Sequence, residues 1–303
     1  PFSASTVLPS DMRSALDAAG TCTLQVEAAQ TAPDRTTKLL LRATDGAAFE
    51  MVIMRYRERV TACISSQVGC PVACAFCATG QGGFERNLTT AEIVDQVRLA
   101  AALVADEGRR LSNLVYMGMG EPLLNLQAVL DSIRVITDPA GLGLGHRAIS
   151  ISTVGIPAGI RRLGRSEPQV NLALSLHAAD DRTRALLIPD TYRHPLERVL
   201  AAAWEHFDLT HRKLLVEYVL LEGVNDSTTD ARRLAALLLG HVVTVNLLAW
   251  NPVGPRPLPG DGREGFRPSS KAAVIAFRDA LQRAGVEAVI RQSKGTGIDA
   301  ACG

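Results

Sequence analysis

The sequence predicts an α/β protein built on a partial barrel, with a small antiparallel β element packed on its amino-terminal side. After residue 60, strand-like and helix-like segments alternate, which is typical of a parallel sheet with right-handed crossovers. About six such units suit a partial barrel better than a closed barrel of eight. Before residue 60 short strands replace this pattern, and hydrophobic residues make up 47% of the 303 residues, enough for a sizeable core.

The elements follow from the residue patterns in chain order. Short strands at 22–27, 38–43 and 49–54 form the β element, and Asp45-Gly46 suits a tight turn between the last two. The barrel begins with a strand at 60–67 and a helix at 89–107, in which Thr89 and Glu92 are spaced as a capping box. The other predicted strands are 114–118, 148–153, 170–176, 214–220, 242–248 and 286–290, and the other helices are 126–136, 159–163, 196–207, 227–239 and 271–284.

Charge and hydropathy exclude several classes of protein. The net charge of +1 excludes a globally basic chain, so nucleic acid would have to be bound by local basic clusters. Residues 1–18 lack a basic start followed by an apolar run, and the most apolar stretch, 234–250, is interrupted by polar residues and short for a membrane span. We therefore expect a cytoplasmic protein without membrane contact.

Three cysteines lie within eight residues, as Cys70-Pro-Val-Ala-Cys74-Ala-Phe-Cys77. Three thiolates on one tight loop can each bind one corner of an iron–sulfur cube. The next cysteine downstream is Cys302, which leaves one iron open for a small molecule, as catalytic metal sites require. A structural zinc loop or unrelated buried thiols are the alternatives, although zinc sites usually come as paired units and no His follows at finger-like spacing.

This spacing, with Phe76 before the last cysteine, resembles the signature of the radical S-adenosylmethionine (SAM) superfamily. The resemblance implies one [4Fe–4S] cluster whose open iron binds the amino and carboxylate groups of SAM. Reductive cleavage of the sulfonium then produces a 5′-deoxyadenosyl radical. The fold implied by the resemblance is a partial (βα)6 radical-SAM barrel, which agrees with the strand count reached from the sequence pattern.

More motifs follow in order along the chain: Ser65-Ser-Gln-Val-Gly-Cys70, Gly83-Phe-Glu-Arg-Asn-Leu88, Met117-Gly-Met-Gly-Glu-Pro122, Ser175-Leu-His177, Trp250-Asn-Pro252 and Asp299-Ala-Ala-Cys-Gly303. From about Leu8 to the end, the chain with these motifs resembles the RNA adenine methyltransferases of the RlmN/Cfr type, and most closely the carbon-2 branch (RlmN). The resemblance and the pattern of segments together imply three parts: a remnant or linker of an amino-terminal RNA-binding domain at 1–20, the β element at 21–58, and the barrel at 59–303 with a catalytic-cysteine tail.

The resemblance implies a set of SAM contacts at the ends of successive strands. Gly120 and Glu121 match the pair that holds the methionine ammonium, and a structural turn closed by Pro122 is the alternative. A shared position at strand carboxyl ends favours a single site, because that edge of a barrel is where active sites gather. The implied ribose, carboxylate and adenine contacts are Ser152, Ser175, Leu176, His177 and Asn251.

The resemblance also implies three catalytic residues. The cysteine matching Cys302 accepts a methyl group from one SAM, loses a hydrogen atom to the radical from a second, and adds to adenine as a methylene radical. Cys63 then attacks Cys302, which forms a disulfide and releases the methylated base. Glu50 matches the base for the ring proton. Taken alone, Glu50 is an exposed strand glutamate and Cys302 an incidental thiol, while Cys22 matches no motif and is expected in the core.

The implied substrate is an adenine of 23S ribosomal RNA, methylated at carbon 2, and an adenine of tRNA. Methylation at carbon 8, as in the Cfr-like antibiotic-resistance branch, is the alternative. Asp299 and Asn87-Leu88 resemble the carbon-2 branch, whereas 292–297 depart from the charged run expected there. Flavodoxin or ferredoxin is the implied electron donor, and we expect a monomer. Basic residues that could hold RNA phosphates include Arg147, Arg161, Arg162 and Arg165.

Three other functions stay open from the residues alone. A radical enzyme with another substrate, such as a glycyl-radical activase or a sulfur-inserting enzyme, would share the cluster but would not need Cys63 and Cys302. An iron–sulfur electron carrier is disfavoured by the three local ligands and by the polar strand ends. A ribosome-assembly protein with a vestigial cluster is the third possibility.

Overall fold

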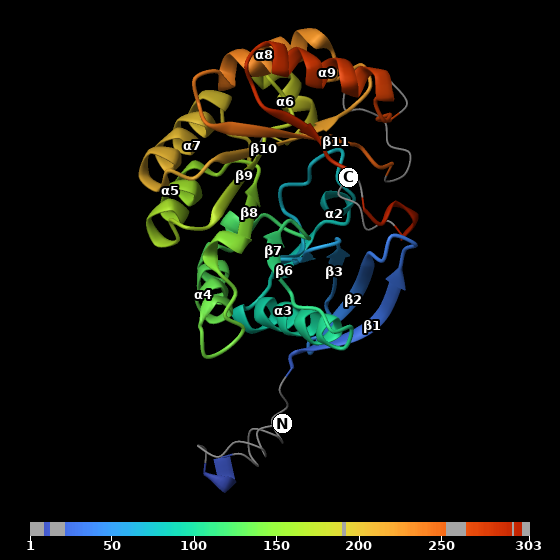
Figure 1. The fold of residues 1–303 in the computed structure, drawn as a ribbon, viewed down its shortest axis with the longest axis vertical. Coiled ribbons are helices and arrows are strands. Elements are labelled where there is room, and N and C mark those ends of the chain that lie inside the picture. Colours follow the sequence, from blue (N-terminus) through green and yellow to red (C-terminus); the bar gives the residue numbers. More distant parts are fainter. Residues whose placement is uncertain (1–8, 13–21, 190–191, 253–264, 293, 299–303) are drawn as a thin grey trace.

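The computed structural model describes residues 9–12, 22–189, 192–252, 265–292 and 294–298. Its main feature is a ten-stranded sheet with the order β1-β2-β3-β4-β7-β8-β9-β10-β11-β12. The sheet curves without closing, and α5, α7, α8 and α9 lie along its outer side while α2 lies on its inner side (Figure 1). The expected α/β fold with a partial barrel is therefore confirmed.

The antiparallel part of the sheet consists of β1 (Leu24–Thr31), β2 (Thr37–Ala43) and β3 (Ala48–Arg55). At the predicted Asp45-Gly46 turn, Gly46 has a φ of 91° and Asp45 accepts a hydrogen bond from the Ala47 amide at 3.1 Å. We expected this element to pack on the barrel. Instead, one edge of β4 (Val60–Cys63) pairs antiparallel with β3 and its other edge pairs parallel with β7. The antiparallel element and the barrel strands therefore form one continuous sheet.

The parallel part follows the predicted alternation of strands and helices. The strands after β4 are β7 (Asn113–Tyr116), β8 (Ile149–Thr153), β9 (Asn171–Ser175), β10 (Leu214–Leu220), β11 (Val243–Ala249) and β12 (Ala288–Ile290). The helices that match the prediction are α3 (Thr90–Ala105), α4 (Leu126–Thr137), α5 (Pro157–Ser166), α7 (Leu196–Thr210), α8 (Thr228–Leu238) and α9 (Lys271–Arg283).

Short elements were not predicted from the sequence. The expected strand at 60–67 ends at Cys63, and β5 (Gln67–Gly69) pairs with β6 (Phe84–Asn87) in a separate two-stranded sheet. The helices α2 (Ala78–Gln81) and α6 (Asp181–Leu187) are likewise new, together with the 3-10 turns η2 (Pro122–Leu124), η3 (His146–Ala148) and η5 (Thr296–Ile298). These segments are too short to show a hydrophobic period.

Helix α3 illustrates how the barrel core is built. Its capping box is present: the Thr89 amide donates to the Glu92 carboxylate at 2.7 Å, and the Glu92 amide donates to the Thr89 hydroxyl at 3.2 Å. Ile93, Val97 and Val104 are fully buried against the sheet, as their spacing predicted. Within the described ranges, no helix is both long and apolar enough to cross a membrane.

Helix α3 also holds the turn that leads out of β4. The Gln96 side chain is fully buried, and its amide oxygen accepts a hydrogen bond from the Ser65 backbone N–H at 2.8 Å. Its amide nitrogen donates to the Ser65 carbonyl oxygen at 3.0 Å. This paired contact satisfies both backbone groups of Ser65 in the interior and fixes the direction in which the chain leaves the sheet.

We predict that Gln96→Leu lowers the free energy of unfolding by about 2 to 4 kcal/mol, because it leaves the Ser65 N–H and C=O buried without these partners. Denaturant unfolding of the metal-free protein measures the change. The matched control is Gln127→Leu, at an exposed position on α4, which should change stability by less than about 0.5 kcal/mol. Equal losses in the two variants would contradict the assignment.

Candidate active site

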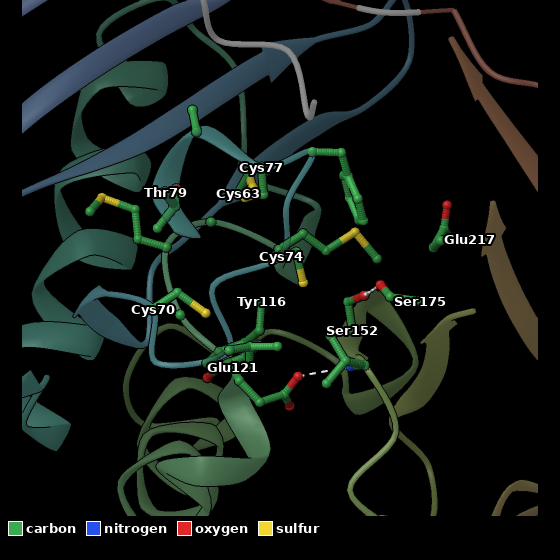
Figure 2. Close-up of a pocket in the computed structure, with 18 of the residues that line it drawn as sticks. Cys63, Cys70, Cys74, Cys77, Thr79, Tyr116, Glu121, Ser152, Ser175 and Glu217 are labelled. Atoms are coloured by element: carbon green, nitrogen blue, oxygen red, sulfur yellow. Dashed lines mark hydrogen bonds between the residues drawn. The ribbon is translucent and has the colours of Figure 1, made fainter. Parts of the chain in front are cut away.

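A cavity of about 580 Å³ lies at the carboxyl ends of the parallel strands, at the edge where barrel enzymes place their sites. Side chains from several strands and from the cysteine loop turn toward it (Figure 2). Predicted site residues on its wall are Glu50, Cys63, Cys70, Cys74, Cys77, Gly120, Glu121, Ser152, Ser175, His177 and Asn251.

The cysteine loop lies between β5 and α2 and is held by contacts on both sides. The Cys77 amide donates to the Cys74 carbonyl oxygen at 3.1 Å, which tightens the loop. Gly80 lies so close beneath it that a Cβ atom there would be 2.9 Å from the Cys74 nitrogen. The Trp250 indole N–H, after β11, donates to the Phe76 carbonyl oxygen at 2.8 Å. The loop is therefore held by Trp250, which follows β11, and by α2, which follows the loop directly.

The three thiols of this loop lie at different depths. Cys74 is buried, whereas Cys70 and Cys77 are half-buried. Burial raises the pKa of Cys70 to about 11 and raises the pKa of Cys74 well above its ordinary value. Neutral thiols are poor metal ligands, so a cationic centre must offset this desolvation before all three can bind as thiolates.

The donor set fits an iron–sulfur cube. In the part of the chain that the structure describes, no three His, Cys, Asp or Glu side chains gather closely enough to hold one metal ion. The thiolates of a cube bind different irons, so they need to face one cavity rather than one point. Cys70, Cys74 and Cys77 all line the same cavity and come from one short loop, which meets this requirement.

Glu121 follows β7 and both caps a turn and lines the cavity. Its carboxylate accepts the Leu123 amide at 3.0 Å and the Val154 amide at 2.8 Å, and the second bond is drawn in Figure 2. The side chain is 3% exposed, and burial raises its pKa to about 7. Glu121 therefore caps the turn η2, as the structural alternative expected, and it also lines the cavity. The two roles are compatible. An ammonium group there would favour the ionised form.

Two glycines let the turn after β7 approach the chain that enters the cysteine loop. A Cβ atom on Gly118 would lie 2.7 Å from the Ser65 hydroxyl oxygen. Gly120 has a φ of 102°, and a Cβ atom there would lie 2.6 Å from the Gln67 Cβ. The Ser65 hydroxyl accepts the Met119 amide at 2.8 Å and donates to the Glu50 carbonyl oxygen at 2.6 Å. The segments around Glu50, Ser65 and Met119 therefore contact one another at one point, where the chain entering the cysteine loop crosses the turn after β7.

The polar residues at the next strand ends are arranged around this cavity. The hydroxyl groups of Ser152 and Ser175 are 2.9 Å apart (Figure 2). His177 has a φ of 59°, and its Nδ1 accepts the Val219 amide at 3.1 Å, which places its proton on Nε2. Burial lowers the pKa of His177 to about 3, so the ring is neutral. Asn251, after β11, also lies on the wall.

Leu176 differs from its neighbours in the same motif. Its side chain is fully buried in the hydrophobic core and is not among the residues that line the cavity. Alternation along the strand explains this, because successive side chains point to opposite faces. Its backbone N–H donates to the Glu217 carbonyl oxygen at 3.1 Å. A SAM contact from Leu176 would therefore have to come from the backbone.

Two of the three predicted catalytic residues reach the same cavity. Glu50, on β3, has an oxygen 3.2 Å from the Lys38 ammonium, and 43% of its side chain is exposed. Cys63, the last residue of β4, is buried on the cavity wall. Cys302 lies outside the described residues. Cys22, which we expected in the core, is exposed just before β1; that expectation was wrong because the first strand begins two residues later.

Glu217 is a site residue that sequence reasoning missed. It lies on β10, lines the cavity and is 8% exposed, and its Oε1 accepts the Asn246 side-chain amide at 2.8 Å. In the parallel register it pairs with Ser175 on β9. Burial raises its pKa. Because a buried carboxylate is costly, its presence inside the apolar strand 214–220 was a signal for an inward-facing functional position.

Comparison with known proteins agrees with this site. The Radical SAM superfamily matches residues 64–235. A "Probable dual-specificity RNA methyltransferase RlmN" of Moorella thermoacetica is 48% identical, with 88% of this chain and 75% of that protein covered. The protein of the same name from a Parafrankia species is 47% identical, with 89% and 71% covered. The crystal structure of a radical SAM methyltransferase from Sphaerobacter thermophilus has a TM-score of 0.92 and 41% identity over 100% of this chain and 87% of that chain. The chain therefore belongs to the radical SAM superfamily and, within it, to the RlmN family of RNA methyltransferases.

Proposed function

We propose that this RNA methyltransferase methylates carbon 2 of an adenine in 23S ribosomal RNA and of an adenine in tRNA. The observation that supports this most is that Glu50 and Cys63 face the same cavity as the cysteine loop and Glu121. A base, a thiol and the cofactor-binding residues thus surround one volume in which a flipped adenine could be held. Methylation at carbon 8 would use the same residues, and Asp299 with Asn87-Leu88 favours carbon 2.

The cavity wall divides into a cluster side and a nucleoside side. Cys70, Cys74 and Cys77 would hold one [4Fe–4S] cluster, which with SAM supplies the 5′-deoxyadenosyl radical when bound. Glu121 and the carbonyl group of Gly120 would bind the methionine ammonium. The remaining SAM contacts are proposed to come from Ser152, Ser175, the Leu176 backbone, His177 and Asn251. The neutral His177 would donate a hydrogen bond from Nε2.

The catalytic steps assigned to the chain's own residues involve two thiols and one carboxylate. The Cys302 thiol takes up the methyl group and carries it to adenine. The Glu50 carboxylate accepts the ring proton, and the Lys38 ammonium 3.2 Å away orients it. Cys63 then attacks the Cys302 sulfur, which forms a disulfide and frees the base. Pairing of β4 with β3 and β7 fixes the position of Cys63 for that attack.

The wider setting of the enzyme is proposed from its family. Residues 1–20 would be a remnant or linker of an amino-terminal RNA-binding domain, 21–58 would form the β element, and 59–303 would carry the barrel and the cysteine tail. Electrons would come from a flavodoxin or ferredoxin to a monomeric protein in the cytoplasm. The pairing of β3 with β4 supports a rigid connection between the last two parts.

The direct test is an anaerobic methylation assay. Reconstituted, reduced protein is incubated with SAM and 23S ribosomal RNA or tRNA, and digested RNA is analysed by mass spectrometry. We predict 2-methyladenosine in both RNAs. 8-Methyladenosine would move the enzyme to the carbon-8 branch. Formation of 5′-deoxyadenosine without methylation of either RNA would contradict the proposed substrate while leaving the cofactor assignment intact.

Substitution of single cysteines separates the proposed thiol roles. Cys302→Ala should abolish methyl transfer, because the carrier thiol is missing, while 5′-deoxyadenosine still forms. Cys63→Ala should instead accumulate a protein–RNA adduct, visible on a denaturing gel as a shifted band that ribonuclease removes. Cys22→Ala, exposed outside the cavity, is the matched control and should retain full activity. Complete RNA methylation by Cys302→Ala would refute the mechanism.

Glu121→Gln tests the ammonium contact. We expect the Kd for SAM to rise about tenfold, because a charge-assisted hydrogen bond is lost; calorimetry measures it, and Glu85→Gln on the exposed strand β6 is the control.

The pKa of Glu121 is raised to about 7 from an ordinary value of 4.5. The folded protein therefore loses stability relative to the unfolded chain as pH rises from 4.5 through 7.

The same variant should remove this pH dependence. The glutamine at position 121 does not titrate. In equilibrium unfolding of the metal-free protein, the free energy of unfolding of Glu121→Gln relative to that of wild type should therefore rise between pH 5 and pH 8. A constant difference across that interval would show that the Glu121 carboxyl is not held in its neutral form.

A further inference from the structure

Arg184 is an arginine enclosed directly behind the cysteine loop. It lies on α6 and is 0% exposed. Helix α6 contacts the loop through its last residue, because the Leu187 carbonyl oxygen accepts the Ala75 amide at 2.9 Å. Leu187 and Ile188 also pack in one hydrophobic cluster with Cys74. Arg184 thus lies about one helical turn along α6 from the residue that contacts the cysteine loop.

This buried cation has no carboxylate partner among the described residues. Its Nη1 donates to the His194 carbonyl oxygen at 3.0 Å, and its Nη2 donates to the Val154 carbonyl oxygen. Its Nε has no hydrogen-bond partner. The ionisable groups that interact with it are the exposed Asp181, the cation Arg193, the Cys74 thiol and the His177 ring. Buried charges in proteins are usually paired, so the function of this one requires an explanation.

The charge of Arg184 acts on the cavity from behind its wall. Burial lowers the pKa of Arg184 to about 10, so the group remains cationic at neutral pH. Cys74, a buried thiol of the loop, packs in the same hydrophobic cluster as Val154 and Leu187. The Val154 backbone lies between Arg184 and the cavity: its carbonyl group accepts from Arg184 and its N–H donates to Glu121. Arg184 is absent from the cavity lining, so it acts through its charge and not by touching a ligand.

We propose that Arg184 is the buried counter-charge of the metal cluster held by Cys70, Cys74 and Cys77, and that it raises the reduction potential of that cluster. The inference rests on the proposed function of the loop. Three thiolates make the cluster anionic, and one electron from the external donor increases its negative charge. A fixed cation nearby stabilises the reduced form more than the oxidised form. Among the described residues no carboxylate forms an ion pair with Arg184, and the largest effect of a charged group on it comes from the exposed Asp181, so a buried anionic cluster would be its principal counter-charge.

The test is a redox titration of the reconstituted protein without SAM, monitored by electron paramagnetic resonance. Arg184→Met removes the charge and keeps most of the apolar volume, whereas Arg184→Lys keeps the charge with fewer donors. We expect the equilibrium constant for reduction to fall about tenfold in the Met variant, which for one electron is about 59 mV. The Lys variant should keep a potential close to that of wild type.

Arg212→Met is the matched control. Arg212 has an unpartnered Nε as well, but its Nη2 donates to the Asn171 side chain at the amino end of β9, the end of the barrel opposite to the cavity. We expect this substitution to lower stability without changing the potential. A potential shift equal to that of Arg184→Met would overturn the proposal, because it would show a general effect of losing an arginine whose Nε is buried and unpartnered.

The remaining outcomes are also decisive. An unchanged potential in Arg184→Met with an intact cluster overturns the inference, and so do equal shifts in the Met and Lys variants. If the Met variant loses its cluster, Arg184→Gln is the second neutral variant. Loss of the cluster in both neutral variants but not in Arg184→Lys supports the counter-charge, whereas loss in all three shows a purely structural clamp and overturns it. Failure of wild type to assemble a cluster would refute the proposed function instead.

Discussion

The site depends on one crossing of the backbone, where segment 65–67 passes against the turn at 118–121. The Met119 carbonyl oxygen accepts two backbone N–H groups of the first segment, at 2.9 and 3.2 Å. The Gln67 side-chain oxygen accepts the Glu121 amide at 2.8 Å. Because the cysteine loop begins soon after the first segment and Glu121 ends the second, the crossing sets where the thiols lie relative to that carboxylate. Glycines in the turn are what allow the two chains to approach so closely.

Burial gives four ionisable groups on the cavity wall the same bias toward the neutral state. The pKa values of Cys70, Cys74 and Glu121 are raised by desolvation, and the pKa of His177 is lowered by it. A site of this kind binds charged ligands by releasing protons: a metal cluster converts thiols to thiolates, and an ammonium group favours the carboxylate. We therefore expect cofactor loading to depend on pH through these wall groups. The Arg184 cation favours the ionised form of Cys74 but the neutral form of His177.

Much of this arrangement could be predicted from the sequence, and the parts that could not have physical causes. The period of the apolar residues and the Thr89–Glu92 capping box predicted α3 correctly, because both are local signals. The pairing of β5 with β6 depends on contacts between segments with no period of their own. The positions of Glu50 and Cys63 on the cavity were expected from family resemblance, and their catalytic roles remain predictions. Glu217 was missed because a single charged residue in an apolar strand shows its partners only after folding. Arg184 was missed because it stands among other charged residues in a short segment, where nothing in the sequence marks it as buried.

We infer that the crossing brings the cysteine loop and Glu121 to the same small molecule. Electron–nuclear double resonance on the reduced, reconstituted protein, with SAM labelled by ¹⁵N in its amino group, measures this directly. We expect a hyperfine coupling between the cluster and the labelled nitrogen, which requires the amino group to lie at the open iron. An intact cluster that shows no such coupling, in a sample where calorimetry confirms that SAM is bound, would contradict it.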